Sequence, residues 1–178
     1  MLSVDQTAKI GGIFALLTIL HFVADWVFQS HAEAMAKPTN HRVRAKHCFI
    51  YAALCLGGIL WCTDPEPEAL AWMAYLLFFS HFLEDTYLPV FVWARFVRKP
   101  PEMDVEAAGP GMRGFVEFAS TPLGKILLIA IDQIVHILFL LPVAAMIVLP
   151  ERARSIGITG AVATALLFIV CWIGKAKK

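Results

Sequence analysis

The sequence predicts an all-α, polytopic membrane helical bundle with about five transmembrane helices, formed by a single domain that covers residues 1–178. Hydrophobic residues make up 59% of the chain and charged residues 16%, whereas a soluble domain has roughly 45–50% apolar and about 25% charged residues. The apolar residues are also gathered into long segments, and a helix that spans a bilayer needs about 20 mostly apolar residues. We therefore expect lipid to be part of the solvent of this chain.

The five predicted spans are joined by short polar loops and by one long loop. We expect the spans at 10–29, 47–62, 69–97, 122–149 and 156–174. The third and fourth are longer than a bilayer requires and contain Pro89 and Pro142, so they are expected to tilt, kink or protrude. The long loop, 98–121, is rich in proline, glycine and acidic residues, which is typical of irregular structure.

The basic residues predict an orientation in the membrane. Twelve of the 15 Lys and Arg residues lie in 30–46, 95–125 and the C-terminal tail, and the other three lie on the opposite side of the predicted spans. The positive-inside rule then places the N-terminus outside and the C-terminus in the cytoplasm. The net charge of +1 supplies no field that would attract nucleic acid, so the expected partner is the lipid bilayer.

Three of the predicted spans contain a histidine and an aspartate four residues apart. Positions i and i+4 lie on one face of a helix with Cβ atoms about 6 Å apart, so both side chains of a pair can address one point. A charged aspartate at the centre of a span costs about 2.5–3.5 kcal/mol, so each of these carboxylates needs a compensating partner. The pairs are His21/Asp25, His81/Asp85 and Asp132/His136.

Together with His47, which opens the second span, these pairs predict a metal site. Imidazole nitrogen and carboxylate oxygen suit Zn²⁺, with Mn²⁺ or Fe²⁺ as alternatives. Seven candidate ligands exceed the four of a structural zinc site and would suffice for a pair of ions, so we expect one or two divalent ions. The predicted ligands are His21, Asp25, His47, His81, Asp85, Asp132 and His136.

Two polar residues near these pairs have predicted positions of their own. Gln29 continues the His21/Asp25 face by one turn and is expected to orient a ligand or a substrate oxygen. Glu84 directly precedes Asp85, so on a continuous helix it points about 100° away from it. We therefore expect Glu84 behind the site or against another helix.

The first loop is the predicted binding site for an anionic head group. It contains Lys37, Arg42 and Arg44, and basic residues beside a membrane attract anionic lipid head groups. A membrane anchor that follows the positive-inside rule is the competing explanation for Lys37. His31 and His41 also lie in this loop and are expected to be ordinary solvated residues.

The order of the motifs HFVADWVFQ, HFLED and DQIVH, with a lysine and a histidine after the first, resembles the bacterial membrane-protein family catalogued as domain of unknown function 3307. This resemblance covers about 20–136 and implies a bacterial inner-membrane location without an activity. A looser similarity to inner-membrane metal-dependent hydrolases, and to the His-x3-Asp/Glu helices of zinc phospholipase C, favours hydrolase chemistry. The implied signature positions are His21, Asp25, Gln29, Lys37, His47, His81, Asp85, Asp132, Gln133 and His136.

These observations favour a membrane-embedded metal-dependent hydrolase that acts on a lipid-borne or amphiphilic ester or phosphoester. A metal-bound water would attack, a carboxylate of Asp25 or Asp85 would serve as general base, and Gln29 would assist. Two other functions stay open. One is a non-catalytic accessory subunit of a larger membrane complex or a homo-oligomer, and the other is an ion- or proton-handling transport protein.

Overall fold

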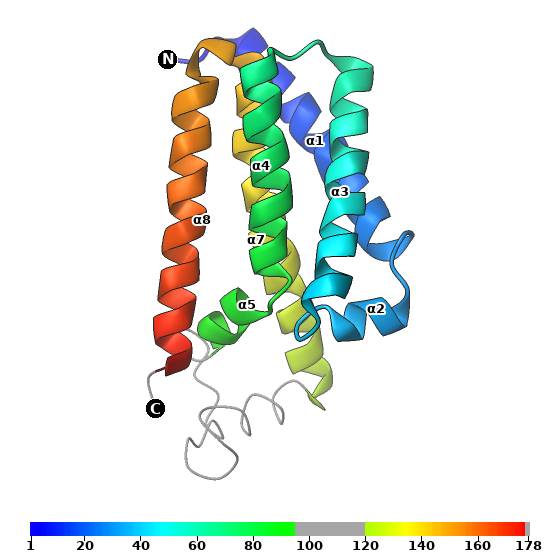
Figure 1. Ribbon diagram of the computed structural model, residues 1–178. Helices are drawn as coiled ribbons and strands as arrows, with labels where there is room; N and C mark the ends of the chain where they lie inside the picture. The colour runs from blue at the N-terminus through cyan, green and yellow to red at the C-terminus, as the bar shows by residue number, and fades with distance from the viewer. Residues whose placement is uncertain (95–119, 177–178) are drawn as a thin grey trace.

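The computed structural model of the chain describes residues 1–94 and 120–176, and within these ranges it is a bundle of helices without strands (Figure 1). This confirms the predicted all-α class. The long helices are α1 (Val4–Trp26), α3 (His41–Cys62), α4 (Pro67–Glu84), α7 (Pro122–Val148) and α8 (Ala153–Ala176). The short helices are α2 (His31–Ala36), α5 (Leu88–Trp93) and a 3₁₀ turn, Pro150–Arg152.

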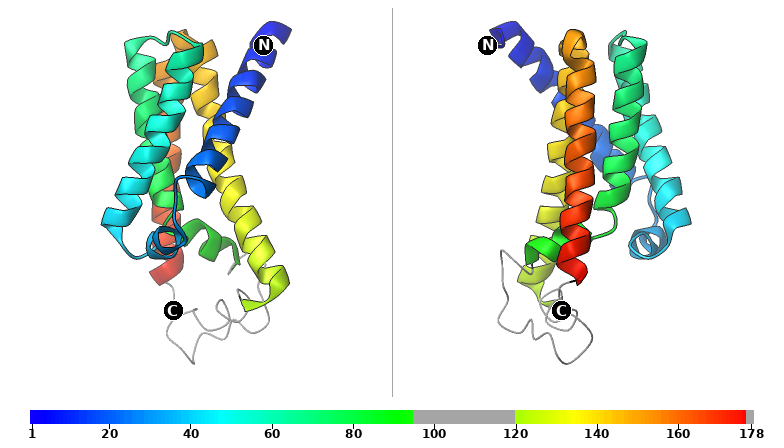
Figure 2. Two further views of the ribbon diagram at one scale, coloured as in Figure 1. Left: turned by 90° about the vertical axis from the view of Figure 1, so that its right-hand side faces the viewer. Right: turned by 60° about the vertical axis from the view of Figure 1, so that its left-hand side comes forward.

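Four helical segments in the described part of the chain are long and apolar enough to cross a membrane. They are α1, α3, α7 and the segment Pro150–Val170, which includes most of α8. The predicted third span is not among them, because the polar residues of α4, which include Glu68, His81 and Glu84, lower its mean hydropathy. It packs against α3, α7 and α8 (Figure 2). Four helices of the described part therefore meet this length and composition, and α4 is packed among them.

The predicted span 69–97 is divided rather than continuous. The helix α4 ends at Glu84, and Tyr87 has a positive φ of 59°. A positive φ is uncommon for any residue other than glycine and ends a right-handed helix. Pro89 then lies in the first turn of α5, a position where its missing N–H breaks no helical bond. Pro89 thus begins a new helix instead of kinking a long one, and residues beyond 94 lie outside the described part.

Side-chain caps set the starts of the other helices. Ser3 and Gln6 form a capping box at the start of α1, so this helix begins before the predicted residue 10. Asn40 caps α3 by accepting hydrogen bonds from two backbone N–H groups, and α3 begins six residues before the predicted 47. Ser30 and Glu33 form a second capping box at the start of α2. Because each cap satisfies free N–H groups, the first predicted loop contains a helix.

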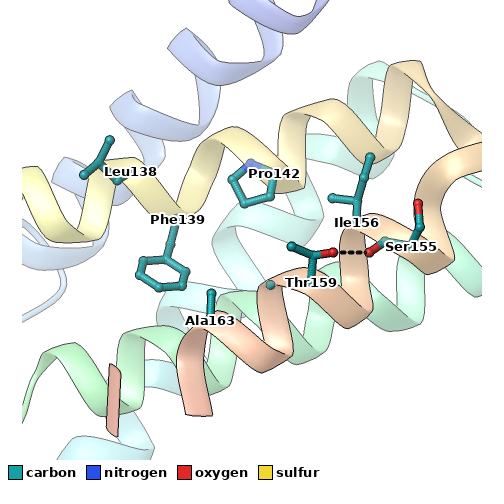
Figure 3. A pocket seen from close by; sticks show the side chains of 8 residues that line it. Leu138, Phe139, Pro142, Ser155, Ile156, Thr159 and Ala163 are labelled. Atoms are coloured by element: carbon teal, nitrogen blue, oxygen red, sulfur yellow. Dashed lines mark hydrogen bonds between the residues drawn. The ribbon is translucent and has the colours of Figure 1, made fainter. Parts of the chain in front are cut away.

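Small residues on α8 let it approach α4 closely. A Cβ atom added at Gly157 would lie 2.4 Å from the Trp72 ring, and one added at Gly160 would lie 2.8 Å from Leu76 Cδ1. On the α7 side, α8 leaves a groove of about 380 Å³ beside Pro142, which stands inside α7 without ending it (Figure 3). Thr159 and Ser155 line that groove, and the hydroxyl of Thr159 donates a hydrogen bond to the backbone oxygen of Ser155 (Figure 3).

Candidate metal centre

Four buried histidines, one from each of α1, α3, α4 and α7, meet inside the bundle. His47 Nε2 and His81 Nε2 are 3.0 Å apart. The ring centroid of His136 lies 4.5 Å from that of His81 and 5.3 Å from that of His21. None of the four is more than 4% exposed. The structure therefore brings together all three predicted histidine–aspartate helices and His47.

Asp25, His47 and His81 form the tightest group of candidate ligands. Asp25 Oδ1 is 2.9 Å from His47 Nε2 and 3.7 Å from His81 Nε2. With the 3.0 Å between the two Nε2 atoms, these separations leave a point about 2 Å from all three atoms, which is the length of a zinc–nitrogen or zinc–oxygen bond. By these separations the three side chains could hold one divalent ion.

Asp85 lies between the pair His47 and His81 on one side and His136 and Lys37 on the other. Its Oδ2 is 3.6 Å from His81 Nε2 and 3.8 Å from His47 Nε2. Its Oδ1 is 3.6 Å from His136 Nε2 and 2.8 Å from Lys37 Nζ. Each carboxylate oxygen therefore faces a different set of cationic or ligand atoms, as in a carboxylate that bridges two positive centres.

Glu84 faces another helix, α7, which is one of its two expected positions, and it joins the cluster there. Glu84 Oε2 is 3.6 Å from His136 Nε2, the same separation as for Asp85 Oδ1. The expectation of a 100° offset assumed a continuous helix, whereas α4 ends at Glu84 and Asp85 is its C-cap, with ψ near 0°. Pro89 is the sequence signal for the end of α4, because a proline is favoured in the first turn of a new helix.

His136 is oriented as a ligand. Its Nδ1 lies 2.7 Å from the backbone oxygen of Asp132 and donates to it, which leaves Nε2 as the nitrogen with a free lone pair in the neutral ring. That Nε2 is buried without a hydrogen-bond partner in the described part of the chain, and so is Glu84 Oε1. The other oxygen of Glu84, Oε2, lies 3.6 Å from this Nε2, and a buried carboxylate beside a buried imidazole lone pair needs a proton or a cation between them.

Three sets of three residues place their ligand atoms close enough to hold an ion. Cys48, outside the predicted ligands, belongs to one of them, with Sγ 4.0 Å from Asp85 Oδ2. His81 is common to all three sets, so they overlap in one centre. The sets are Asp25/His47/His81, Cys48/His81/Asp85 and His81/Glu84/His136.

Two predicted ligands lie beside this centre. His21 Nε2 bonds to Gln133 Oε1 at 3.0 Å and lies 3.6 Å from Asp25 Oδ2, so His21 supports a ligand. Asp132 accepts from Gln133 Nε2 and its side chain is 16% exposed. Its nearer oxygen is 3.9 Å from His136 Nδ1, the nitrogen that faces away from Glu84. Neither residue belongs to a three-ligand set among the described residues.

Gln29 does not share a helix face with His21 and Asp25. The helix α1 ends at Trp26, so Gln29 lies in the link to α2. Its Nε2 is buried and has no hydrogen-bond partner among the described residues. Its predicted helical position was wrong, because the helix ends before it.

The three basic residues of the first loop have different positions. Lys37, the C-cap of α2, is buried and forms an ion pair with Asp85. Arg44 is buried in α3, and its Nη1 donates to the backbone oxygens of Lys37 and Pro38 at 3.0 and 3.3 Å. Arg42 is exposed. Lys37 and Arg44 thus belong to the buried cluster and its support, and Arg42 does not.

Tyr51 contacts the centre but is not among the residues predicted from the sequence. Its ring stacks on that of His81 with centroids 3.9 Å apart and an interplanar angle of 11°. Tyr51 lies four residues after His47 in α3. Because i and i+4 share a helix face, the spacing rule that found the aspartates would also have found Tyr51.

A surface ion pair holds α2 in place. Glu33 Oε1 accepts a hydrogen bond from Lys46 Nζ at 2.7 Å. This bond, aided by the N–H and hydroxyl of Ser30, lowers the pKa of Glu33 to about 2. Since Lys37 is the C-cap of α2, the pair fixes the helix that delivers Lys37 to Asp85.

No curated protein and no solved structure matches the chain. A family model described as "Protein of unknown function (DUF3307)" matches residues 13–163. The matched range contains every residue of the buried cluster, from His21 to His136. Since the match covers most of the chain, the protein belongs to the DUF3307 family.

Proposed function

We propose that this protein is a membrane-embedded metal-dependent hydrolase that cleaves an ester or phosphoester bond of an amphiphilic substrate. One observation carries the proposal. Asp25 Oδ1, His47 Nε2 and His81 Nε2, from three different helices, lie 2.9–3.7 Å from one another in a buried cluster. Imidazole and carboxylate ligands of this kind favour Zn²⁺, with Mn²⁺ or Fe²⁺ as alternatives.

The energetic cost of the cluster supports a bound cation. Asp25, Glu84 and Asp85 are all buried, and buried carboxylates are costly unless they are paired. Lys37 is the only ammonium group within ion-pair distance of them in the described part of the chain. A divalent ion would supply positive charge for the carboxylates that Lys37 does not reach.

The neighbouring carboxylates suit proton transfer. A divalent ion lowers the pKa of a bound water to about 7, so hydroxide is accessible near neutral pH. We assign Glu84 as the proton acceptor, because its Oε1 is buried and has no hydrogen-bond partner among the residues that the structure describes. Hydrolysis would then add the hydroxyl of water to the acyl carbon or phosphorus, and Glu84 would return the proton to the leaving oxygen.

The membrane location is part of the same proposal. Four helices have the length and composition to span a bilayer, and we infer that α4, packed among them, crosses it as well. The distribution of the basic residues then favours an N-terminus outside and a C-terminus in the cytoplasm of a bacterial inner membrane. In that orientation the cluster lies towards the cytoplasmic face. Labelling of Cys62, which is exposed, by an impermeant thiol reagent added from the outside of intact cells tests the orientation.

A non-catalytic metal centre is the second candidate, and the depth of the cluster favours it. His21, His81 and His136 are at most 1% exposed, whereas a catalytic zinc keeps a position open to water or substrate. Such a centre would fasten α1, α3, α4 and α7 together, as expected of an accessory subunit of a larger assembly.

Metal content and turnover test the proposal. The full chain is purified in detergent without chelators, and its metals are measured by mass spectrometry. We expect bound Zn²⁺, Mn²⁺ or Fe²⁺ in the wild type and its loss in His81→Ala. Asp132→Asn is the matched control and should retain the metal, because this carboxylate lies outside the three ligand sets.

Turnover is then measured on p-nitrophenyl esters and phosphoesters and on phospholipid vesicles. Chelator-sensitive hydrolysis supports the enzyme. A wild type without transition metal overturns the metal centre, and bound metal without hydrolysis of any of these probes favours the non-catalytic centre.

A further inference from the structure

A second feature of the molecule is an elongated groove of about 770 Å³ between α4, α5 and α8. Its volume lies in the range of about 300–1,000 Å³ that is common for ligand sites. Along α8 its lining extends from Ala161 to Trp172, which corresponds to about 16 Å of helix. The walls are aromatic and aliphatic, with Tyr75, Phe79 and Phe168 among them. A groove of this length and lining suits an extended hydrocarbon chain.

One end of the groove is basic. His41 and Arg44, at the start of α3, line it there, and no acidic side chain does. The guanidinium of Arg44 lies over the Phe82 ring, with Cζ 4.5 Å from the centroid. Arg44 is 2% exposed. Its Nη1 donates to two backbone oxygens and its Nη2 contacts His41 Nδ1, whereas its Nε has no hydrogen-bond partner and no carboxylate forms an ion pair with it among the described residues. A buried cation without an anionic partner is costly, so this end is complementary to an anion.

We propose that this groove binds one acyl chain of a lipid whose anionic phosphate head group lies at Arg44 and His41. The outer face of α8 supports a lipid rather than a polar ligand, since Phe168, Ile169 and Trp172 are 46–60% exposed and apolar or amphipathic. The Nε–H of Arg44, which has no hydrogen-bond partner among the described residues, can donate to a phosphate oxygen, and a charged donor of this kind forms a strong hydrogen bond with an anion.

The basic end of the groove is adjacent to the candidate metal centre. Leu83 and Thr86 line the groove and flank Glu84 and Asp85, which face the cluster. Arg44 also bonds to the backbone oxygen of Lys37, whose ammonium holds Asp85. A phosphate at Arg44 would therefore lie next to the turn that carries the carboxylates. This makes an anionic phospholipid the substrate class, a step that rests on the proposed function, whereas the binding itself does not.

Quenching of tryptophan fluorescence by brominated acyl chains tests the binding. The full chain is reconstituted in vesicles with increasing fractions of brominated phosphatidylglycerol, or of brominated phosphatidylcholine for comparison. The contribution of Trp172 is the difference between the wild type and Trp172→Phe. We expect half-maximal quenching of Trp172 at a several-fold lower fraction of the anionic lipid than of the zwitterionic lipid.

Three variants sharpen the test. Arg44→Gln should abolish the preference for the anionic lipid. Ala165→Phe narrows the apolar part of the groove without removing a charge, and should weaken quenching by both lipids even if Arg44→Gln fails to fold. Arg154→Gln is the matched control, since Arg154 pairs with Glu68 on the surface, and should leave the preference unchanged.

The outcomes separate the two proposals. Equal quenching by the two lipids overturns the groove proposal. Absence of quenching does so too, and indicates that a second copy or another segment covers the groove. In His81→Ala the lipid preference should persist although the metal is lost. Lipid preference without turnover in the wild type overturns the hydrolase alone, and turnover without lipid preference overturns the groove alone.

Discussion

Lys37 forms an ion pair with Asp85, with Nζ 2.8 Å from Oδ1, and the two side chains are 8% and 4% exposed. Each residue is a helix C-cap, Lys37 of α2 and Asp85 of α4. A short surface helix thus supplies a cation to a buried cluster. The ammonium occupies one oxygen of Asp85 and leaves the other facing His47 and His81, which favours one divalent ion at the Asp25/His47/His81 group.

We expect Lys37→Met to destabilise the metal-free protein. Removing one partner of a buried ion pair leaves the other charge uncompensated and typically costs about 3–5 kcal/mol. Thermal unfolding in detergent with chelator present measures the change. The double variant Lys37→Met/Asp85→Asn should be less destabilised than Lys37→Met alone. Equal destabilisation of the two variants would show that the ion pair does not govern stability.

The same lysine should limit metal stoichiometry. If its ammonium takes the place of a second ion at Asp85, the wild type binds about one divalent ion, and Lys37→Met binds up to two, as a bridging carboxylate permits. Metal analysis after equilibrium dialysis against Zn²⁺ or Mn²⁺ gives both values. Arg42→Met is the matched control, because Arg42 is exposed, and should bind as the wild type does. A wild type with two ions would contradict this assignment.

Metal removal should lower the melting temperature of the wild type. A ligand that binds only the folded state stabilises it by about 2.7 kcal/mol at a free concentration of 100 times Kd. We expect a chelator to lower the melting temperature of the wild type and of Asp132→Asn, but to leave that of His81→Ala unchanged. A melting temperature of the wild type that does not respond to chelator would mean that no ion is bound under those conditions.

Glu84→Gln should separate metal binding from chemistry. Glu84 does not belong to the Asp25/His47/His81 group, so the variant should retain an ion there. If Glu84 accepts the proton of the attacking water, kcat should fall by roughly 10²–10⁴-fold, the usual contribution of a general base, with little change in KM. A variant that retains both metal and kcat would exclude Glu84 as the base and return that role to Asp85.

The sequence predicted which residues meet in the buried cluster better than it predicted where the helices end. The four-residue spacings in His21/Asp25 and His81/Asp85, together with the cost of charge in lipid, predicted a shared centre, and these residues do meet. The errors concern helix ends. Apolar periodicity continues past Trp26 and Glu84, but the backbone does not remain helical there.

These helix ends decide which polar residues reach the cluster. Because α4 ends at Glu84, the adjacent Glu84 and Asp85 can both face His136. Because α1 ends at Trp26, Gln29 does not continue the face of Asp25. Spacing along one helix carries no information about which neighbouring helix a side chain meets. The contact of Lys37 with Asp85 could therefore not be predicted from spacing.

The ion pair of Glu33 with Lys46 should make the position of α2 sensitive to acid. The pKa of Glu33 is lowered from its ordinary value of 4.5 to about 2 by the hydrogen bond from Lys46. A carboxyl group with a lowered pKa stabilises the folded state fully above its unfolded pKa, and this contribution is lost as the pH falls towards the folded value. Glu33→Gln should therefore increase hydrogen exchange in residues 30–37 at pH 7, and its difference from the wild type should shrink between pH 4.5 and about 2. Asp5→Asn, which breaks the exposed pair with Lys9 in α1, is the control and should not alter this segment. A difference that is independent of pH would assign the effect to the Ser30 cap instead.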